Sequence, residues 1–403
     1  MARYLATVAP GLEAVAASEL EAKLPQAMLE PPLRGRLIVE TERPWQDLLA
    51  LRTVDNLYLH LARWPVGLHK ADLASLRKAA RRLAVPFDLL LTDNAPRRRK
   101  AIEFVVHASR TGRHTYSRFE AAEAVAAGLA AADRRLVRAR PLPGRPAQLE
   151  FRLDVLSDVA HLSARLTPPS FRFRGERRFV RGALRPSVAH GLVWLSGPRP
   201  EQRFLDPCCG SGTILTERIA YPARAVWGGD IDKEAVAAAR ANAEQAIGGR
   251  AAPPYRVAEW DAGALPLDPG SIDVVVSNLP FGRQIGDPGS VEALYRRLAA
   301  ELARVLSPKG AAWLLTERPA VLQTACAEAG LAAVVVGTLS LRGLTPAIVR
   351  TGREAGAPPQ TPNPRVEAAS REGAISCTPA RERSPLPRRS SSEPVPSSSP
   401  SLS

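Results

Sequence analysis

The stretch Phe204-Leu205-Asp206-Pro207-Cys208-Cys209-Gly210-Ser211-Gly212-Thr213-Ile214 decides the fold that this sequence predicts. Its apolar start is typical of a buried strand, its centre of a tight glycine-rich turn, and its end of a helix. Gly210 and Gly212 permit backbone conformations and a close ligand approach that a Cβ atom would block. The helix start beyond them favours an anionic group such as a carboxylate. The stretch therefore predicts a strand, a ligand-binding loop and a helix of an open α/β sheet.

The residues around this loop indicate the kind of ligand. A nicotinamide-binding loop has the pattern GxGxxG, whose third glycine lets the helix pack on the strand, and that position is filled differently here. Asp206 precedes the loop, and a carboxylate there suits the ammonium or sulfonium of S-adenosylmethionine better than it suits a pyrophosphate. The candidate residues for binding this methyl donor are Asp206, Gly210, Ser211, Gly212 and Thr213.

Apolar runs and helical patterns alternate along the rest of the second half. We expect strands at residues 203–205, 225–229, 272–277 and 311–315, helices at 213–219, 233–247 and 291–306, and a final strand pair at 332–337 and 345–349. Strands that are apolar almost throughout and separated by helices are typical of a parallel sheet covered on both faces. The fold class predicted for this half is therefore α/β, with a doubly wound, Rossmann-like sheet.

Two acidic residues follow later strands of this expected sheet. Asp230 lies at a strand tip where a carboxylate accepts both hydroxyls of a ribose, and Ile231 beside it offers an apolar face for an adenine. Asp261, followed by Ala262, is a candidate acceptor for the adenine amino group. Each acid by itself is equally explained as a capping residue, as Asp232 is. Their order after the glycine loop makes a cofactor site the more specific interpretation.

The run Ile272-Asp273-Val274-Val275-Val276-Ser277-Asn278-Leu279-Pro280-Phe281-Gly282 has the features of a reactive site. Ligands of open α/β sheets bind beyond the carboxyl ends of the strands, so Asn278 to Phe281 are expected to face the donor methyl group. The lone pair of an exocyclic base amine is delocalised into the ring. Hydrogen bonds from that amine to the Asn278 side-chain oxygen and the Pro280 carbonyl oxygen would orient it, while Phe281 stacks on the base. A strand that simply ends in a turn is the alternative.

The first 168 residues predict two small α+β units. Residues 1–65 show strand patterns at 4–8, 36–39 and 56–61 and helical patterns at 12–24 and 45–51. Residues 66–168 show helical patterns at 70–83 and from about Phe119, and strand patterns at 101–108, 148–156 and 159–166.

Positive charge is concentrated in the same half of the chain. Of the net charge of +15, residues 1–200 carry +14, residues 201–352 carry −1 and residues 353–403 carry +2. This division favours polyanion binding in the first half and small-molecule chemistry in the second, with an arginine-rich composition as the alternative explanation. Segment 109–118 is the candidate for RNA contact and stacking, through Arg110, Arg113, His114, Tyr116 and Arg118. A solvated loop without RNA contacts is the alternative interpretation of this segment.

The cysteines and the hydropathy of the sequence exclude several classes of protein. Cys208, Cys209, Cys326 and Cys377 form no CxxC pair and have no accompanying His cluster, so we expect neither a disulfide framework nor a metal site. No run of about 18 apolar residues and no secretory signal pattern occurs, which favours a cytoplasmic protein without a membrane span. Residues 353–403, rich in Pro, Ser and Arg, are predicted to form a disordered tail.

Together these motifs resemble a known family. DPCCGSGT (206–213), GGDID (228–232) and SNLPFG (277–282) are similar to class I methyltransferases that carry an N-terminal ferredoxin-like domain and an RNA-binding THUMP domain. Further similar stretches begin at Ala6, Arg110 and Phe171, so that the resemblance covers about residues 1–350. It implies a ferredoxin-like domain at 1–65, a THUMP domain at 66–168 and a methyltransferase domain at 169–352.

The resemblance also implies an activity and its partners. Members of this family methylate the N2 of a guanine in the acceptor stem of tRNA or, more distantly, in large-subunit rRNA, with S-adenosylmethionine as cofactor. By motif, Asp206, Gly210 and Gly212 would bind the methionine part, Asp230 the ribose, Asp261 the adenine, and Asn278 to Phe281 the target base. The stretch that begins at Arg185 resembles the part of the family that covers the cofactor. Cys208 departs from the family pattern, where a larger apolar residue is expected.

Other functions fit parts of the same pattern. The Asn-Pro-aromatic device also serves adenine-N6 methylation, although Leu279 and Gly282 are closer to the guanine-N2 enzymes. An RNA-binding protein with an inactive methyltransferase fold is a second alternative, against which Asp206, Asp230 and Asn278 speak. Cytosine-C5 methylation needs a cysteine nucleophile at the base, whereas Cys208 and Cys209 lie in the cofactor loop.

Overall fold

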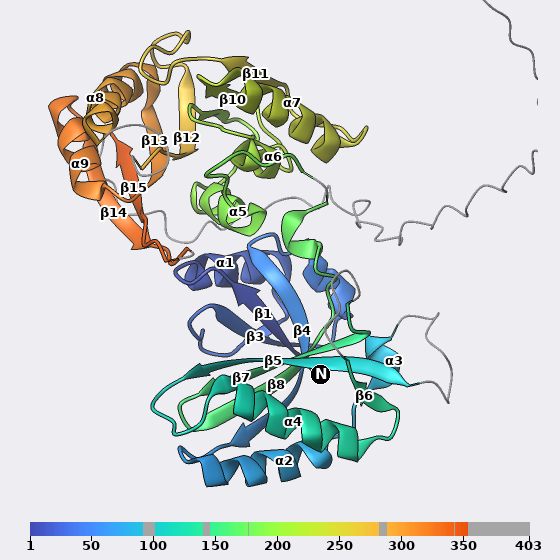
Figure 1. The fold of residues 1–403 in the computed structure, drawn as a ribbon. Helices are drawn as coiled ribbons and strands as arrows, with labels where there is room; N and C mark the ends of the chain where they lie inside the picture. The colour runs from blue at the N-terminus through green and yellow to red at the C-terminus, as the bar shows by residue number, and fades with distance from the viewer. Residues whose placement is uncertain (92–100, 140–145, 176, 282–287, 342, 354–403) are drawn as a thin grey trace, which may run out of the picture. The chain divides into compact units, whose positions relative to one another are not determined.

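The computed structural model describes residues 1–91, 101–139, 146–175, 177–281, 288–341 and 343–353. Within these ranges the strands form two sheets, one from residues 2–165 and one from residues 203–352 (Figure 1). Gly282 and the predicted tail from Glu354 onward lie outside the described residues.

The first sheet has eight strands in the order β2-β3-β1-β4-β8-β7-β5-β6. The strands are β1 (Ala2–Val8), β2 (Met28–Leu29), β3 (Arg36–Thr41), β4 (Val54–Pro65), β5 (Ile102–Thr111), β6 (Leu136–Arg138), β7 (Leu149–Leu156) and β8 (Val159–Arg165). Neighbouring strands are antiparallel except that β5 runs parallel to both β6 and β7.

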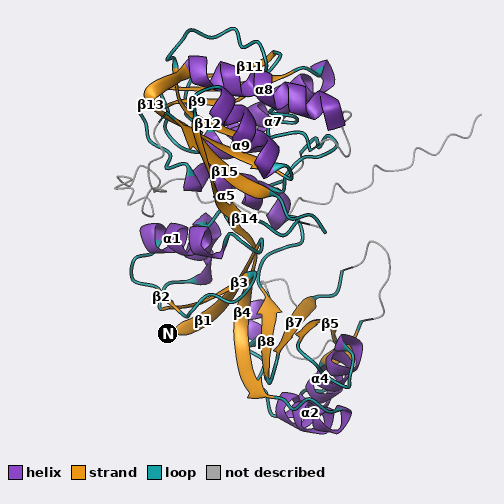
Figure 2. Ribbon diagram, turned by 90° about the vertical axis from the view of Figure 1, so that its left-hand side faces the viewer, coloured by secondary structure: helices purple, strands orange, loops and turns teal. Residues whose placement is uncertain are grey.

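A single long strand joins the two units that the sequence suggests. Strand β4 pairs with β1 through Leu57 and Leu59, and with β8 from Tyr58 to Pro65. The expected α+β units therefore share one continuous sheet, as Figure 2 shows. Sequence pattern could not predict this pairing, because a strand's periodicity does not state which other strand lies beside it.

Helices cover this first sheet in two groups. The helices are α1 (Glu13–Lys23), α2 (Leu73–Arg81), α3 (Phe87–Leu90) and α4 (Arg118–Ala132), with 3-10 turns η1 (Trp45–Ala50), η2 (Lys70–Asp72) and η3 (Phe171–Phe173). Leu20 of α1 packs with Val8 and Leu57, whereas Leu76 of α2 and Val125 of α4 pack with the β5 to β8 half. Segment 45–51, expected as a helix, is a 3-10 turn.

The second sheet has seven strands in the order β11-β10-β9-β12-β13-β15-β14. They are β9 (Arg203–Asp206), β10 (Ala225–Asp230), β11 (Tyr255–Glu259), β12 (Ile272–Asn278), β13 (Leu306–Thr316), β14 (Ala332–Thr338) and β15 (Ala347–Gly352). All are parallel to one another except β15, which lies antiparallel between β13 and β14.

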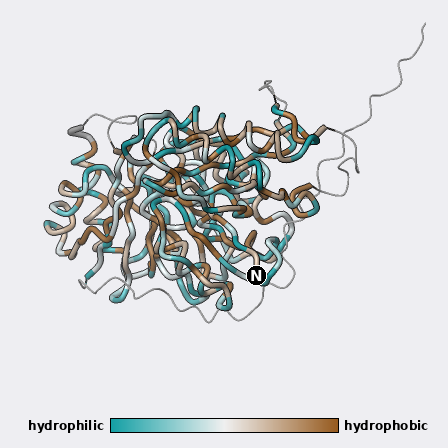
Figure 3. The backbone as a smooth tube through the Cα atoms, turned by 90° about the horizontal axis from the view of Figure 1, so that it is seen from below, coloured by the Kyte–Doolittle hydropathy of each residue, from teal (hydrophilic) through white to brown (hydrophobic). Residues whose placement is uncertain are grey.

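Helices cover both faces of this sheet. They are α5 (Pro186–Leu195), α6 (Thr213–Arg218), α7 (Lys233–Ile247), α8 (Pro288–Val305) and α9 (Pro319–Glu328). Consecutive residues of β9 face opposite sides, because Phe204 packs with α5, α6 and α7 while Leu205 packs with α8 and α9. Figure 3 shows hydrophobic stretches, in brown, alternating with hydrophilic ones, in teal, along the backbone. The predicted doubly wound α/β fold is confirmed.

Helix α5 is absent from the sequence expectations for a physical reason. Every residue from Pro186 to Trp194 is buried, so the helix has no polar face to reveal a period of 3.6 residues. Strand β13 starts at Leu306, five residues before the expected start, because Leu306 already pairs with Ile272; a register shift separates this pair from the next one, Val274 with Ala311.

Candidate active site at the carboxyl edge of the second sheet

Three neighbouring strands bring the predicted motifs to one edge. Asp206 ends β9 opposite Gly228 of β10, and Asp230 follows at the tip of β10. On the other side of β9 lies β12, paired through Leu205 and Val275, which ends at Asn278. Because parallel strands end at the same edge, motifs separated by 72 positions meet there.

The two glycines of the loop, Gly210 and Gly212, have different structural roles. Gly210 has φ of +52°, and a Cβ there would meet only Val180 Cγ2 at 3.5 Å. Gly212 has φ of +75°, and a Cβ there would come within 2.9 Å of the Ala239 Cβ. Gly212 therefore lets α6 pack against α7, whereas Gly210 leaves its surroundings open to a ligand.

Asp206 is a buried carboxylate without a cationic partner among the described residues. It is 1% exposed, and its Oδ1 accepts a hydrogen bond of 2.7 Å from Ser277 Oγ. Burial raises the pKa of Asp206 to about 7, only partly opposed by the hydrogen bonds from Ser277 and the Cys208 backbone. A cation brought to this carboxylate would restore its ionised form.

Asp230 ties the glycine loop to the tip of β10. Its Oδ2 accepts from the Gly210 backbone N–H at 2.8 Å, and its Oδ1 accepts from the Asp232 N–H at 3.1 Å. Ile231 is 73% exposed, which leaves an apolar side chain at the same edge. Asp232 caps α7 by accepting from the Glu234 N–H at 2.8 Å, as its capping interpretation predicts.

Asp261 has structural partners that sequence reasoning missed. Its Oδ1 accepts from the Gly263 N–H at 2.8 Å, and its Oδ2 forms an ion pair with Arg297 of α8. The Gly263 hydrogen bond is the main cause of a lowered pKa, with Arg297 adding to it. The preceding Trp260 and the following Ala262 are buried. Any ligand contact of Asp261 must therefore share oxygens that are already bonded.

The reactive motif, Asn278 to Phe281, contains one hydrogen-bond acceptor that has no partner among the described residues. Asn278 Nδ2 donates to the Gly182 carbonyl at 3.2 Å, while its Oδ1 is buried and has no hydrogen-bond partner among the described residues. Ser211 Oγ in the glycine loop is buried without such a partner as well. An unpaired buried polar atom costs about 1–3 kcal/mol, so both atoms fit positions at which a ligand completes the hydrogen bonding.

Tyr295 of α8 supports the same motif. Its hydroxyl lies 2.9 Å from the Pro280 carbonyl, to which it donates, and 2.8 Å from Thr316 Oγ1. The ring is fully buried, and burial raises the pKa of Tyr295 to about 12, so the hydroxyl keeps its proton. One lone pair of the Pro280 carbonyl is thereby used and the other stays free, and Phe281 beside it is half-buried. No local sequence signal connects Tyr295 with Pro280.

A segment that we call the strap, residues 177–185, is bonded to the glycine loop and to the reactive motif. The Arg178 N–H donates to Asn242 Oδ1 at 2.9 Å, and Asn242 Nδ2 donates to the Ser211 carbonyl at 2.8 Å. Gly182 accepts from Asn278, as described above. Arg185, where the expected covering stretch begins, pairs with Asp55 of β4 at 2.5 Å.

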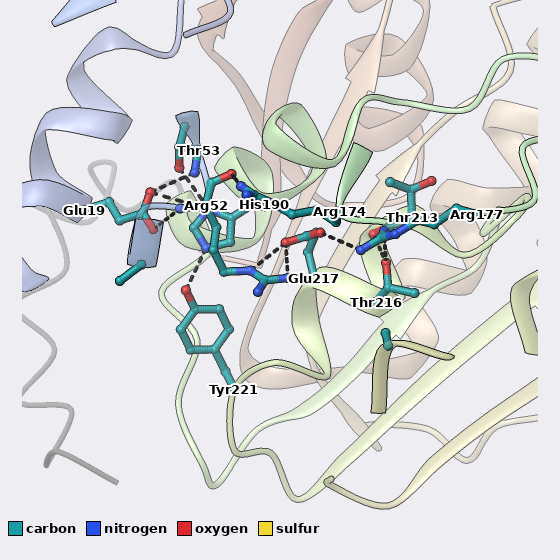
Figure 4. Close-up of polar contacts among 12 residues, drawn as sticks. Glu19, Arg52, Thr53, Arg174, Arg177, His190, Thr213, Thr216, Glu217 and Tyr221 are labelled. Carbon is teal, nitrogen blue, oxygen red and sulfur yellow. Dashed lines mark hydrogen bonds and ion pairs between the residues drawn. The ribbon is translucent and has the colours of Figure 1, made fainter. Parts of the chain in front are cut away.

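Buried charges hold the start of the strap, in a cluster that we call the charged junction: Glu19, Lys23, Arg52, Arg177, His190, Glu217 and Tyr221. Glu217 of α6 pairs with Arg52 at 2.7 Å and with Arg177 at 3.3 Å (Figure 4). Glu19 of α1 accepts from the backbone N–H groups of Arg52 and Thr53. The junction therefore links α1, the strap and α6.

The predicted RNA-contact residues divide into exposed and buried ones. Tyr116 is 2% exposed and donates its hydroxyl to the Gly67 carbonyl at 3.0 Å, so the expectation that it stacks on RNA is wrong. The His114 ring lies tilted against the Tyr116 ring and contacts the Ser157 carbonyl, and Arg110 donates a hydrogen bond to the His114 carbonyl. Arg113 and Arg118 are exposed.

The exposed aromatic residue of this region is one position away from Arg118. Phe119 is 70% exposed, and the Arg118 guanidinium lies 4.8 Å from its ring centre. The capping box of α4, in which Ser117 and Glu120 bond reciprocally, turns Phe119 outward and Tyr116 inward.

The cysteines of the loop do not suit nucleophilic chemistry. Burial raises the pKa of the Cys208 and Cys209 thiols, and the carboxylate of Asp206 raises both further. Burial also raises the pKa of Cys326. A thiol with a raised pKa is a poor nucleophile, which argues against cytosine-C5 methylation by these three residues.

The described residues contain neither a cluster of metal ligands nor a helix of membrane-spanning length and hydropathy. No group of three or more His, Cys, Asp or Glu side chains among them is arranged to hold a metal ion. None of their helices has the length and hydropathy needed to cross a membrane.

Comparisons with known proteins agree with this geometry. Residues 174–345 match the family UPF0020, RMKL-like, methyltransferase domain. The chain is similar to a tRNA (guanine(6)-N2)-methyltransferase of Thermus thermophilus, with 33% identity over 79% of this chain and 90% of the relative. It is also similar to human tRNA (guanine(6)-N(2))-methyltransferase THUMP3, with 30% identity over 42% of this chain and 35% of the relative. The crystal structure of TrmN from Thermus thermophilus superposes with a TM-score of 0.71 and 28% identity, covering 88% of this chain and 100% of that chain.

Proposed function

The chain belongs to the tRNA (guanine(6)-N2)-methyltransferase family, and on that premise we propose that it transfers a methyl group from S-adenosylmethionine to the N2 of a guanine in tRNA. The target in the acceptor stem, at the position equivalent to guanine 6, is the finer part of this proposal. A tRNA substrate is consistent with the cytoplasmic location that the sequence suggests.

The residues at the carboxyl edge fit this donor. Asp206 offers a buried carboxylate for a cationic group, and Gly210 leaves open space beside the loop. Ser211 offers a hydroxyl that has no hydrogen-bond partner among the described residues. Asp230 keeps lone pairs for ribose hydroxyls, and Ile231 presents an apolar surface for a purine. With Gly212, Thr213, Asp261, Ala262 and Asn278 they form the proposed donor site. When bound, the donor supplies an electrophilic methyl group on sulfur.

The reactive motif would orient the guanine amine. One N–H of the amine donates to Asn278 Oδ1 and the other to the Pro280 carbonyl, which directs the nitrogen lone pair towards the methyl group. Transfer forms an N–C bond and breaks the C–S bond, and one proton leaves N2. Both acceptors are neutral groups of low basicity, so they position the amine, and the proton passes to water. Phe281 stacks on the base.

RNA binding is proposed for the first 168 residues. We assign residues 1–65 to a ferredoxin-like part and 66–168 to a THUMP part, joined by the shared sheet, and residues 169–352 to the methyltransferase domain. The concentration of positive charge in residues 1–200 supports this division. Exposed Arg113 and Arg118 remain candidate contacts, Arg110 and His114 shape their loop, and Phe119 replaces Tyr116 as the stacking residue.

The observation that carries the proposal is Asn278 Oδ1, which is buried without a hydrogen-bond partner among the described residues, at the edge where Asp206 and Asp230 also lie. The test is incubation of the protein with unmodified tRNA, unmodified rRNA and labelled S-adenosylmethionine, followed by nucleoside analysis. Label in N2-methylguanosine from tRNA is the expected result. Label in N6-methyladenosine, label only in rRNA, or no label at all would contradict it.

A further inference from the structure

The strap carries an exposed aromatic ring close to the reactive motif. Phe179 is 46% exposed, although large apolar side chains are usually buried. Its only ring contact among the described residues is an edge-to-face type of pair with Phe173, with ring centres 6.2 Å apart. One flat face of the Phe179 ring is therefore available to a partner.

The backbone on both sides of Phe179 is held in place. Arg178 donates its N–H to Asn242 Oδ1 at 2.9 Å and accepts from Asn242 Nδ2 at 2.7 Å. Three residues after Phe179, the Gly182 carbonyl accepts from Asn278 Nδ2 at 3.2 Å. Three residues span at most about 11 Å, so the backbone of Phe179 lies within that distance of the strap's contact with the reactive motif.

The side chains around Phe179 are suited to a polyanion. Arg172, Arg178 and Arg181 are exposed, and none of the three forms an ion pair with another described residue. An open hollow of about 420 Å³ lies beside Arg178 and is also lined by Asn242 and Gln245. Free guanidinium groups next to a stacking surface are the usual means by which proteins hold unstacked nucleotides.

We propose that Phe179, with Arg178 and Arg181, binds the nucleotide next to the target guanine once the guanine has left the helical stack. The inference rests on the proposed function, in which the guanine belongs to a base-paired stem. An enzyme must extrude such a base to reach its amine, and this leaves the neighbouring base with one uncovered face. Phe179 covers that face, and the two arginines contact the adjoining phosphates.

Substitution of Phe179 tests this assignment. We expect Phe179→Ala to reduce single-turnover methylation of tRNA about 5- to 100-fold, the range that loss of one base-aromatic contact produces. Phe179→Trp should keep most of the activity, and Phe179→Leu, which retains an apolar contact with Phe173, should resemble the alanine variant. Affinity for S-adenosylmethionine and the melting temperature should stay unchanged, because they report the fold and the donor site. A native rate for Phe179→Ala would overturn the proposal.

A substrate change gives a sharper test. A tRNA in which the target guanine faces a mismatched base needs less help in leaving the stack, so the defect of Phe179→Ala should shrink on it. An equal defect on both substrates would overturn the stacking role. A photoreactive nucleotide placed next to the guanine should crosslink within residues 178–181; crosslinking only elsewhere would contradict the assignment.

The arginines have a matched control. Arg178→Gln and Arg181→Gln, made one at a time, should each weaken tRNA binding several-fold and lower its salt dependence, whereas Arg250→Gln, an equal change of charge just after α7, should do neither. Equal effects of the three substitutions would show that the strap arginines act only through the overall positive charge of the protein, and would contradict the proposal. If the unaltered protein methylates guanine N2 while all strap variants act normally, this inference fails alone; if it transfers no methyl group, the proposed function fails.

Discussion

Glu217 and Asp206 are both fully buried carboxylates, but they lie in two regions whose surroundings shift the carboxyl pKa in opposite directions. At the charged junction, burial raises the pKa of Glu217, but Arg52, Arg174 and Arg177 outweigh burial and hold the pKa below its usual value. At the active-site edge, no described cation approaches Asp206, and burial raises its pKa to about 7.

The hydrogen bonds differ in the same way. At the junction, Glu19 accepts hydrogen bonds from two backbone N–H groups and from Lys23. Burial lowers the pKa of His190 to about 3, so its ring is neutral, and it forms hydrogen bonds with the hydroxyls of Thr53 and Tyr221. At the edge, Asn278 Oδ1 and Ser211 Oγ lack partners within the described chain. The junction is complete by itself, whereas the edge has the features of a region completed by a ligand.

The largest effect is expected from a substitution that breaks the charged junction and so lowers the free energy of unfolding. Glu217→Gln removes the charge that Arg52 and Arg177 share, and uncompensated buried charges typically cost about 3–5 kcal/mol. We expect a loss of that size in the free energy of unfolding, measured by chemical denaturation. Glu244→Gln on the exposed side of α7 is the control and should change stability by less than about 0.5 kcal/mol. Equal stabilities of the two variants would contradict the role of the junction.

The next effect concerns chemistry at the edge. Asn278→Ala should slow single-turnover methyl transfer at least about a hundredfold with little change in donor affinity, because positioning and hydrogen bonding act on the amine. Asn278→Asp keeps an acceptor of nearly the same shape and should retain more activity than the alanine variant. Near-native turnover of Asn278→Ala would return Asn278 to the role of a strand-terminating residue.

The pH dependence of Asp206 sharpens the contrast between the regions. The folded protein without ligand keeps the Asp206 proton up to about pH 7, while the unfolded chain loses it near its ordinary pKa of 3.8. The contribution of Asp206 to stability therefore falls as pH rises from about 4 to 7. Binding a cation favours the ionised form, so donor affinity should rise about tenfold between pH 6 and pH 8.

Asp206→Asn separates the two consequences. The variant should lose most of the Asp206-dependent change in donor affinity with pH. It should also be more stable than the unaltered protein at pH 8, where the buried carboxylate is ionised and has no cationic partner among the described residues. Calorimetric titration and thermal unfolding at the two pH values measure them. A wild-type pH profile in the variant would remove Asp206 from the donor site.

The smallest effect tests the support of the reactive motif. Tyr295→Phe removes the hydrogen bond to the Pro280 carbonyl, worth about 0.5–1.5 kcal/mol, and should slow transfer by up to about tenfold with unchanged donor affinity. Thr316→Val leaves the hydrogen bond to the Pro280 carbonyl in place; it removes the other partner of the hydroxyl, together with the hydrogen bond from the Arg318 N–H, and should slow transfer less. Equal losses in turnover and donor affinity would indicate a packing role for Tyr295.

Local order in the chain was enough to predict most strands of the second sheet and the composition of its edge, although it did not indicate helices α5 and α9. The glycine loop, the apolar strands and the helices between them are signals carried by neighbouring residues, and parallel strands necessarily end at one edge. Asp206, Asp230 and Asn278 could be placed together on this ground alone. The capping roles of Asp232 and Ser117 follow equally from residues one to three positions away.

Tertiary structure alone decided which groups lack partners and which have them. The pairing of Glu217 with Arg52 spans 165 positions, and the contact of Asn278 with Gly182 spans 96. Segment 109–118 shows the same limit, because its pattern of charge and aromaticity did not tell that Tyr116 faces inward while Phe119 faces solvent. The period of a helix or strand states which residues share a face; what packs against that face depends on segments far away in the chain.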